Sequence, residues 1–235
     1  DRSLGGFDEN HYLLYFGYLP LKEIALTFFS ASNHIFHTLL MRLMMLGFGD
    51  ENEIAIRAVS FLSGIVGLWV IYKLALKLFD SLWIARISLL VATVCPVHVL
   101  YSQTARGYGL MMLLSVSAIY AVLKMLETGR VVPWGILVVL LGFLSVYTLP
   151  TSVYFVFGLS GWVFLVLFLS DWRQDFDFAK SSIKQCWILM TGILMGIALL
   201  TLLVYLPIMD QMAGVGRIMM SGEAKEMYGL KDNLV

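Results

Sequence analysis

The sequence predicts an all-α, polytopic membrane protein. Of its 235 residues, 60% are hydrophobic and only 14% are charged, whereas soluble domains have about 45–50% apolar and about 25% charged residues. The apolar residues are gathered in runs long enough to cross a bilayer. Lysines and arginines cluster around alternate short loops, as in multi-span membrane proteins. The net charge is zero, which gives no indication of a nucleic-acid partner.

Six apolar runs approach the length of about 20 residues that a membrane helix needs. The few charged side chains inside them lie near the ends, where they can reach the interface. Pro96 comes late in the second run, where a kink is tolerated if neighbours satisfy the freed carbonyl. The six predicted spans are Ala58–Phe79, Trp83–Leu100, Gly107–Leu126, Val131–Leu149, Val153–Leu169 and Cys186–Pro207.

The positions of the cations predict which side of the membrane each loop faces, because cytoplasmic loops are richer in lysine and arginine. The loops around Ser81, Thr128 and Gln174 are predicted to be cytoplasmic, and the short alternate loops contain only Arg106. The cations in or beside the three cytoplasmic loops are Lys73, Lys77, Arg86, Lys124, Arg130, Arg173, Lys180 and Lys184.

Three regions follow from this arrangement. Residues 1–57 are predicted to form an external loop with amphipathic helices on the membrane surface, residues 58–207 a six-helix transmembrane module, and residues 208–235 the start of a further external loop. Because the chain begins at Asp1 without a methionine, we expect it to be a fragment of a longer protein. The apolar stretches too short or too interrupted to span are Tyr12–Leu19, Ile24–Phe29 and Ile35–Phe48, with Asn33 as the predicted N-cap of the last.

Two neighbouring acids, Asp8 and Glu9, lie in the external loop beside aromatic and apolar residues. Desolvation near a membrane surface raises the pKa of a carboxylate, which suits general-base work. The pair is therefore a candidate catalytic site. A solvated loop acid or a helix cap would explain the same residues without chemistry, and the pattern alone favours that simpler interpretation.

His34 and His37 are three residues apart, so on a helix they share one face. With Asp8 or Glu9 they would offer imidazole and carboxylate ligands to a divalent metal. Nothing in the sequence supplies a fixed third ligand, and hydrogen-bonded or interfacial histidines are commoner. We therefore assign no metal and no cofactor, and keep a divalent cation as the alternative.

The segment from Tyr101 to Tyr108, Tyr-Ser-Gln-Thr-Ala-Arg-Gly-Tyr, opens the third predicted span. Its Arg106 is a cation on the side that should be poor in cations. A guanidinium beside a helix N-terminus is a good phosphate site. The alternative is an interfacial anchor for lipid headgroups, with the two tyrosines as interfacial aromatics. An external carboxylate together with this arginine suggests an enzyme that acts on a membrane-held, phosphate-bearing substrate.

Four landmarks then follow one another along the chain: Phe7-Asp-Glu9, Asn33-His-Ile-Phe-His-Thr-Leu-Leu40, Gly49-Asp50 with Glu53-Ile-Ala-Ile-Arg57, and Ser102-Gln-Thr-Ala-Arg-Gly-Tyr108. In order and spacing they resemble the membrane glycosyltransferases that use polyprenyl-phosphate sugars, the GT-C fold. The resemblance is to the bacterial relatives of protein O-mannosyltransferases and aminoarabinose transferases in particular. It covers most of the chain and is strongest from Gly6 to Leu126.

The resemblance implies a GT-C-like N-terminal module with one further membrane helix ahead of Asp1. It implies an inverting transfer of a sugar from a polyprenyl-phosphate donor to an acceptor on the non-cytoplasmic face, with the protein in a bacterial inner membrane and the active site on the periplasmic side. Asp8 would be the catalytic base with Glu9 beside it, and Arg106 would neutralise the leaving phosphate. The other expected substrate-binding residues are Tyr108, Gln103, Tyr101, His34 and Asn33.

Two departures from the family pattern leave a rival hypothesis open. Ile35 and Phe36 replace the prolines that follow the histidine, and Thr104 replaces the glutamate of the Ser-Gln-Glu motif. The rival is a non-catalytic membrane subunit that keeps this fold as a scaffold or as a lipid-binding component beside other membrane subunits. A transporter fits less well, because the spans lack the paired broken helices and buried charges of that class.

Overall fold

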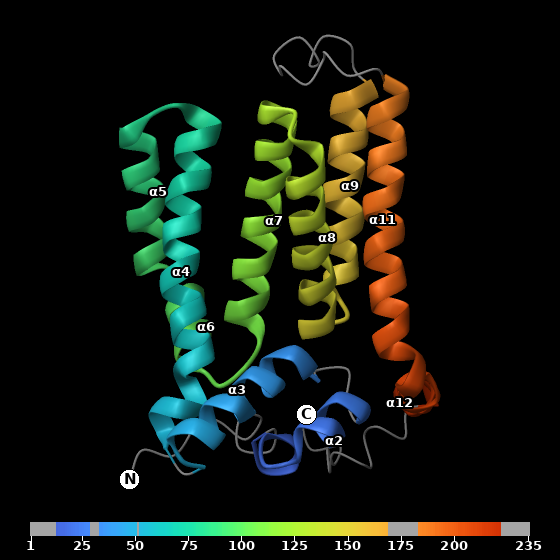
Figure 1. Cartoon of the computed structure of the whole chain (residues 1–235). Helices are drawn as coiled ribbons and strands as arrows, with labels where there is room; N and C mark the ends of the chain where they lie inside the picture. Colours follow the sequence, from blue (N-terminus) through green and yellow to red (C-terminus); the bar gives the residue numbers. More distant parts are fainter. Residues whose placement is uncertain (1–12, 29–32, 51, 169–182, 222–235) are drawn as a thin grey trace, which may run out of the picture.

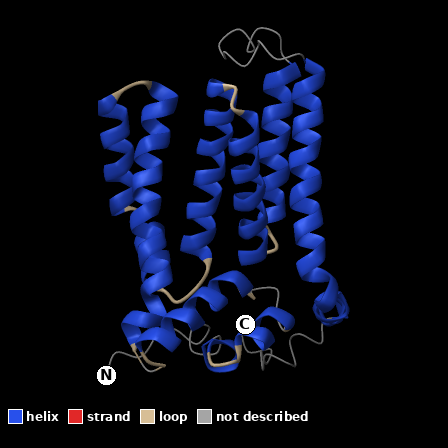
Figure 2. Cartoon of the chain, in the orientation of Figure 1, coloured by secondary structure: helices blue, strands red, loops and turns tan. Residues whose placement is uncertain are grey.

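A computed structural model describes residues 13–28, 33–50, 52–168 and 183–221, and every regular element within these ranges is helical (Figure 2). The predicted all-α membrane fold is therefore confirmed. The long apolar helices run side by side, and the short N-terminal helices lie across one end of them (Figure 1).

Helices correspond to all six predicted spans. Four are long and apolar enough to cross a membrane by themselves, and a bent pair brings the number to five. The sixth, α9 (Ser152–Phe168), is apolar but has only 17 residues, so the number six is not established among the described residues. The others are α4 (Glu53–Phe79), α5 (Leu82–Val94) with α6 (Pro96–Gln103), α7 (Tyr108–Thr128), α8 (Val131–Thr148) and α11 (Ile183–Tyr205).

The second span bends next to Pro96, a position at which the sequence tolerates a kink. The axes of α5 and α6 differ by 59°. Proline disfavours helical geometry in the residue before it, and Cys95 accordingly has an extended backbone with ψ of 117°. Pro96 then occupies the first turn of α6, where its missing N–H costs little. The bend ends the span early and turns α6 toward the segment that joins it to α7.

The short helices gather at the end of the bundle opposite the α4–α5 and α7–α8 connections (Figure 1). The segment Ile35–Phe48 is a helix with those bounds, α3, and its place on the membrane surface stays a prediction. The N-cap prediction for Asn33 is wrong: His34 holds that position without a side-chain cap, and Asn33 instead donates to the Thr27 carbonyl at 2.9 Å. The remaining elements here are η1 (Leu13–Gly17), α2 (Leu21–Leu26), η3 (Leu206–Ile208) and α12 (Met209–Ser221).

Helix α12 is tied to α2 by the amide of Gln211. This side chain accepts a hydrogen bond from the Phe28 N–H at 2.7 Å and donates one to the Leu26 carbonyl at 3.1 Å. The two bonds satisfy backbone groups at the end of α2 and just after it, where no helical partner is available. The chain after the last long helix therefore returns to the same end as the N-terminal helices.

Helix α7 is the centre of the bundle, between α4 and α8 (Figure 1). Its buried side is apolar, from Leu110 to Leu126. Helix α4 meets its neighbours through small buried residues such as Ser60, Ser63 and Gly64, which allow close approach of the backbones. At the opposite end, Glu127 pairs with both Lys77 of α4 and Lys124 of its own helix.

A labelling experiment tests the predicted orientation. The structure sets the exposed Thr128 and the exposed Thr151 at opposite ends of α8, which makes them a matched pair of positions. In intact cells that carry the full-length protein without Cys95 and Cys186, Thr151→Cys should react with an impermeant thiol reagent, and Thr128→Cys should be protected, because its loop is rich in cations. Labelling of Thr128→Cys before lysis would show that the orientation is the opposite of the predicted one.

Candidate functional site

The turn between α6 and α7, residues 104–107, carries the predicted phosphate-binding arginine. Helix α4 holds this turn at both ends. The Arg57 guanidinium donates to the Gln103 carbonyl at 2.5 Å, and the Ser60 hydroxyl donates to the Arg106 carbonyl at 3.1 Å. Because residues 57 and 60 are three apart, both lie on one face of α4. The backbone that carries Arg106 is thus fixed from a single helical surface.

Three glycines allow the elements around the turn to approach this closely. A Cβ at Gly107 would lie 2.9 Å from both His34 Nδ1 and Thr148 Cγ2, and one at Gly109 would lie 2.9 Å from the Tyr101 carbonyl oxygen. A Cβ at Gly64 would overlap Ser102. A larger residue at these positions would push α3, α4 or α8 away from the turn, since the interior leaves little free space.

The Arg106 side chain lies beside a cluster of aromatic rings centred on Tyr108. Its Cζ lies 5.4 Å from the centre of the Tyr108 ring, a cation–π arrangement. The Tyr108 ring also packs against Tyr101, with ring centres 4.6 Å apart, and edge-on against His34 at 4.8 Å. Three residues predicted separately as site residues therefore converge on Tyr108. Ring faces beside a half-buried guanidinium provide a surface on which an anion and a sugar could both rest.

Both histidines of the predicted pair are fully buried. Burial lowers the pKa of His34 to about 3, with smaller contributions from His37 and Arg106, and burial alone lowers the pKa of His37 to about 3. Both imidazoles are therefore neutral at neutral pH. The Thr148 backbone at the end of α8 offsets a small part of this lowering of the His34 pKa, and His37 Nε2 lies 3.0 Å from the Ser60 hydroxyl.

These pKa values predict acid sensitivity of the fold. Between pH 6.5 and about 3, the unfolded chain binds protons that the folded chain excludes, so stability is complete above pH 6.5 and is lost as the pH falls. Each histidine should cost about 2 kcal/mol at pH 5. Melting temperatures in detergent at pH 7.5 and pH 5 should differ less for His37→Phe than for wild type. An equal fall in melting temperature in both proteins would show that His37 does not contribute to the acid sensitivity of the fold.

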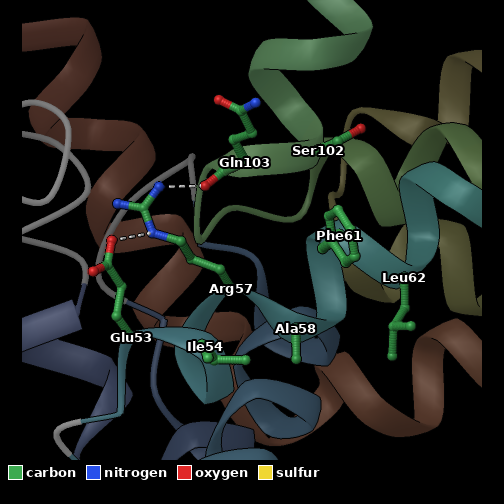
Figure 3. Close-up of a pocket in the computed structure, with 8 residues that line it drawn as sticks. All are labelled: Glu53, Ile54, Arg57, Ala58, Phe61, Leu62, Ser102 and Gln103. Atoms are coloured by element: carbon green, nitrogen blue, oxygen red, sulfur yellow. Dashed lines mark hydrogen bonds and ion pairs between the residues drawn. The ribbon is translucent and has the colours of Figure 1, made fainter. Parts of the chain in front are cut away.

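A cavity of about 490 Å³ borders the same turn between α4 and α6 (Figure 3). Apolar side chains dominate its walls, and its polar groups are Gln103, Ser102 and the ion pair of Arg57 with Glu53, whose Nε and Oε1 atoms are 3.2 Å apart. Because the guanidinium charge is balanced there, the cavity favours an uncharged chain. Its apolar walls are Ile54, Ala58, Phe61 and Leu62.

The structure brings together four of the predicted site residues, and two others, Gln103 and Asn33, are not part of this cluster. Tyr101, Arg106, Tyr108 and His34 form one cluster. Gln103 is exposed and lines the cavity, and Asn33 is buried and bonded to backbone. Asp8 and Glu9 lie outside the described residues. The site roles of all eight residues stay predictions.

Sequence reasoning missed two residues of α4 that fix the turn. Arg57 was noted only as part of a family landmark, although the i, i+4 spacing of Glu53 and Arg57 indicates a helical ion pair. Nothing in the sequence around Ser60 indicated a role at the site, because a serine inside an apolar run is common. The link from Ser60 to Arg106 spans 46 residues and depends on how α4 meets the turn.

Two observations bear on the departures from the family pattern and on metal binding. In the described ranges, no three histidine, cysteine, aspartate or glutamate residues come close enough to hold a metal ion. The hydroxyl of Thr104, which stands where the family motif has a glutamate, is buried and meets no hydrogen-bond partner in the described part of the chain.

Comparison with known proteins gives one match. A family model described as dolichyl-phosphate-mannose-protein mannosyltransferase matches residues 33–205, which includes the histidine pair, the Arg106 turn and all the long helices. No individual curated protein and no solved structure matches the chain.

Proposed function

Because the chain belongs to the dolichyl-phosphate-mannose-protein mannosyltransferase family, we propose that it is an inverting glycosyltransferase that moves a sugar from a polyprenyl-phosphate donor to an acceptor on the non-cytoplasmic face. Membership in the family supports a membrane glycosyltransferase that uses such a donor. The direction of transfer, the acceptor side and the residue roles below are our proposal. The charge pattern supports a site on the non-cytoplasmic face, and a bacterial inner membrane with a periplasmic site is part of this proposal.

One observation carries the proposal: a cation and an apolar cavity border the same turn. Arg106 lies over Tyr108 within the turn, and Gln103 at its start lines the cavity. A polyprenyl-phosphate sugar needs both features, because its phosphate is an anion and its chain is a hydrocarbon. The guanidinium would hold the phosphate through paired hydrogen bonds, while the first isoprene units would lie along Phe61 and Leu62.

The proposed reaction is a single displacement. Asp8 accepts the proton of an acceptor hydroxyl, and that oxygen attacks the anomeric carbon on the face opposite the phosphate. The bond between the anomeric carbon and the phosphate oxygen breaks, and polyprenyl phosphate leaves. Arg106 stabilises the negative charge that develops on the leaving oxygen, which is where a fixed cation is most effective.

The remaining predicted residues divide by exposure. Tyr101, Tyr108 and Gln103 are accessible enough to contact the donor. His34 and Asn33 are buried, so any contact they make with substrate would follow a rearrangement. Glu9 is proposed to orient Asp8 or to hold the acceptor.

The non-catalytic subunit remains the second candidate, and Thr104 favours it. A threonine in place of the family's glutamate removes one acid from the site. A scaffold could still bind a polyprenyl phosphate without consuming it, so binding alone does not separate the two functions.

The donor proposal predicts an effect of filling the cavity. Ala58→Trp places an indole between α4 and α6, where the hydrocarbon chain is expected to lie. The KM for a long-chain donor should rise about tenfold, since a lost apolar contact of this size is worth about 1–2 kcal/mol, while a short-chain analogue should be less affected. Val91→Trp, on an exposed part of α5, is the control. Equal effects on both donors would show that the hydrocarbon chain of the donor does not lie in this cavity.

A further inference from the structure

We infer that His37 is a positioning residue: through Ser60 it fixes the backbone of Arg106, and thereby sets the direction of the guanidinium. The inference rests on the proposed function only in that Arg106 is taken to bind the donor phosphate. The hydrogen-bond chain on which it depends is a property of the fold. It joins α3, α4 and the turn between α6 and α7.

The direction of each hydrogen bond in this chain follows from the number of protons available. The Ser60 hydroxyl has one proton, and it must point to the Arg106 carbonyl, because a carbonyl only accepts. Toward His37 the same oxygen can then only accept, so the proton between them belongs to Nε2 of the imidazole. His37 is therefore the Nε2–H tautomer and the first donor of the chain.

The environment of the other ring nitrogen, Nδ1, indicates that the bond from Nε2 to Ser60 is the one hydrogen bond that the described part of the chain provides for this imidazole. His37 is fully buried, and its Nδ1 has no hydrogen-bond partner in the described part of the chain. A buried polar atom without a partner costs stability, and an apolar side chain of similar size would avoid that cost. The bond from Nε2 to the Ser60 hydroxyl offsets part of this cost.

Ser60 and Arg57 act on opposite ends of the turn. Arg57 fixes the carbonyl of Gln103 and Ser60 fixes the carbonyl of Arg106. If Ser60 rotates away, the second end is released while the first stays bound. The peptide that carries Arg106 then turns about the remaining contact, and the guanidinium leaves the Tyr108 ring, from which its Cζ is now 5.4 Å.

Three variants separate this positioning role from a general effect on folding. His37→Phe keeps the ring and removes the donor, and His37→Gln restores an amide N–H near the position of Nε2. Ile24→Ala is the control, because it removes a buried side chain at the same end of the bundle outside the hydrogen-bond chain. All are compared as the full-length protein in detergent, at equal folded fraction.

The first measurement is amide hydrogen exchange, which needs no activity. His37→Phe should raise the exchange rate in residues 103–108 about tenfold, the effect of losing one buried hydrogen bond of about 1.4 kcal/mol. His37→Gln should recover part of the protection, and Ile24→Ala should leave this segment as in wild type. Unchanged exchange of residues 103–108 in His37→Phe would overturn the inference, whatever the activity of the protein.

The second measurement is a double-mutant cycle on transfer from polyprenyl-phosphate mannose. His37→Phe should lower kcat/KM about tenfold in the wild-type background and have no further effect when Arg106 is already alanine, because residues that act through one another are not additive. The same loss in both backgrounds would overturn the positioning role. If the wild type neither binds nor consumes the donor, the proposed function fails and the exchange result alone decides the inference.

Discussion

Replacement of Asp8 by asparagine is expected to lower turnover by about 10²–10⁴-fold, which is the usual cost of losing a positioned general base. Asparagine keeps the size of the side chain and cannot accept the acceptor's proton. Donor binding should change little, because the phosphate is assigned to Arg106. The measurement is single-turnover transfer by the full-length variant, together with donor affinity.

Two control variants make the Asp8 result specific. Glu9→Gln should be milder, since Glu9 is expected to orient the base or the acceptor. Glu23→Gln, which changes an exposed acid on α2, should be silent. Turnover of Asp8→Asn close to wild type would remove Asp8 from catalysis, and a fall caused only by weaker donor binding would reassign it to the donor site.

Arg106→Lys is expected to weaken donor binding about tenfold to a hundredfold, and Arg106→Gln more. Lysine keeps the positive charge and loses the planar fork that bonds a phosphate through two parallel hydrogen bonds. A hydrogen bond to a charged group is worth about 1.5–3 kcal/mol, which gives that range of affinity. The position of Arg106 over the Tyr108 ring also favours the flat guanidinium over an ammonium.

Arg86 provides the matched control for Arg106. Its Cζ lies 5.8 Å from the centre of the Trp83 ring, a similar cation–π arrangement at an exposed position on α5. Arg86→Lys should leave donor affinity unchanged, because an interfacial cation needs no fork. If Arg106→Lys is equally silent, Arg106 is an interfacial anchor and the phosphate is bound elsewhere.

The long apolar helices could be predicted from sequence because each depends on local composition. Apolar runs predicted the helices α4, α7, α8 and α11, and Pro96 marks a position at which a kink is tolerated, next to the observed bend between α5 and α6. Helix α4 begins at Glu53, five residues before the predicted start at Ala58. The side chain of Asn52 caps the helix there by accepting hydrogen bonds from the Ile54 and Ala55 N–H groups. Because the first turn of α4 is polar, a search for apolar runs places the start of this helix too late.

The candidate site was only partly predictable because its geometry depends on contacts between distant segments. The Tyr101–Tyr108 motif and the histidine pair could be identified by type and spacing. The contacts of His34 with the Tyr108 ring and of His37 with Ser60 follow from the packing of α3 against α4 and α8. Asn33 was predicted as an N-cap because of its residue type, whereas the Thr27 carbonyl lies within reach of its amide and takes the bond instead.

The central claim is that the full-length protein consumes a polyprenyl-phosphate sugar. The most direct test uses native membranes, as the source of the acceptor, from cells that produce either wild type or Arg106→Gln. Radiolabelled polyprenyl-phosphate mannose is added, and both the released polyprenyl phosphate and the labelled product are quantified. We predict one polyprenyl phosphate for each sugar transferred by wild type, and a loss of at least about a hundredfold in Arg106→Gln. Equal, background release from both membranes, with the donor bound but intact, would contradict an enzyme and support the scaffold.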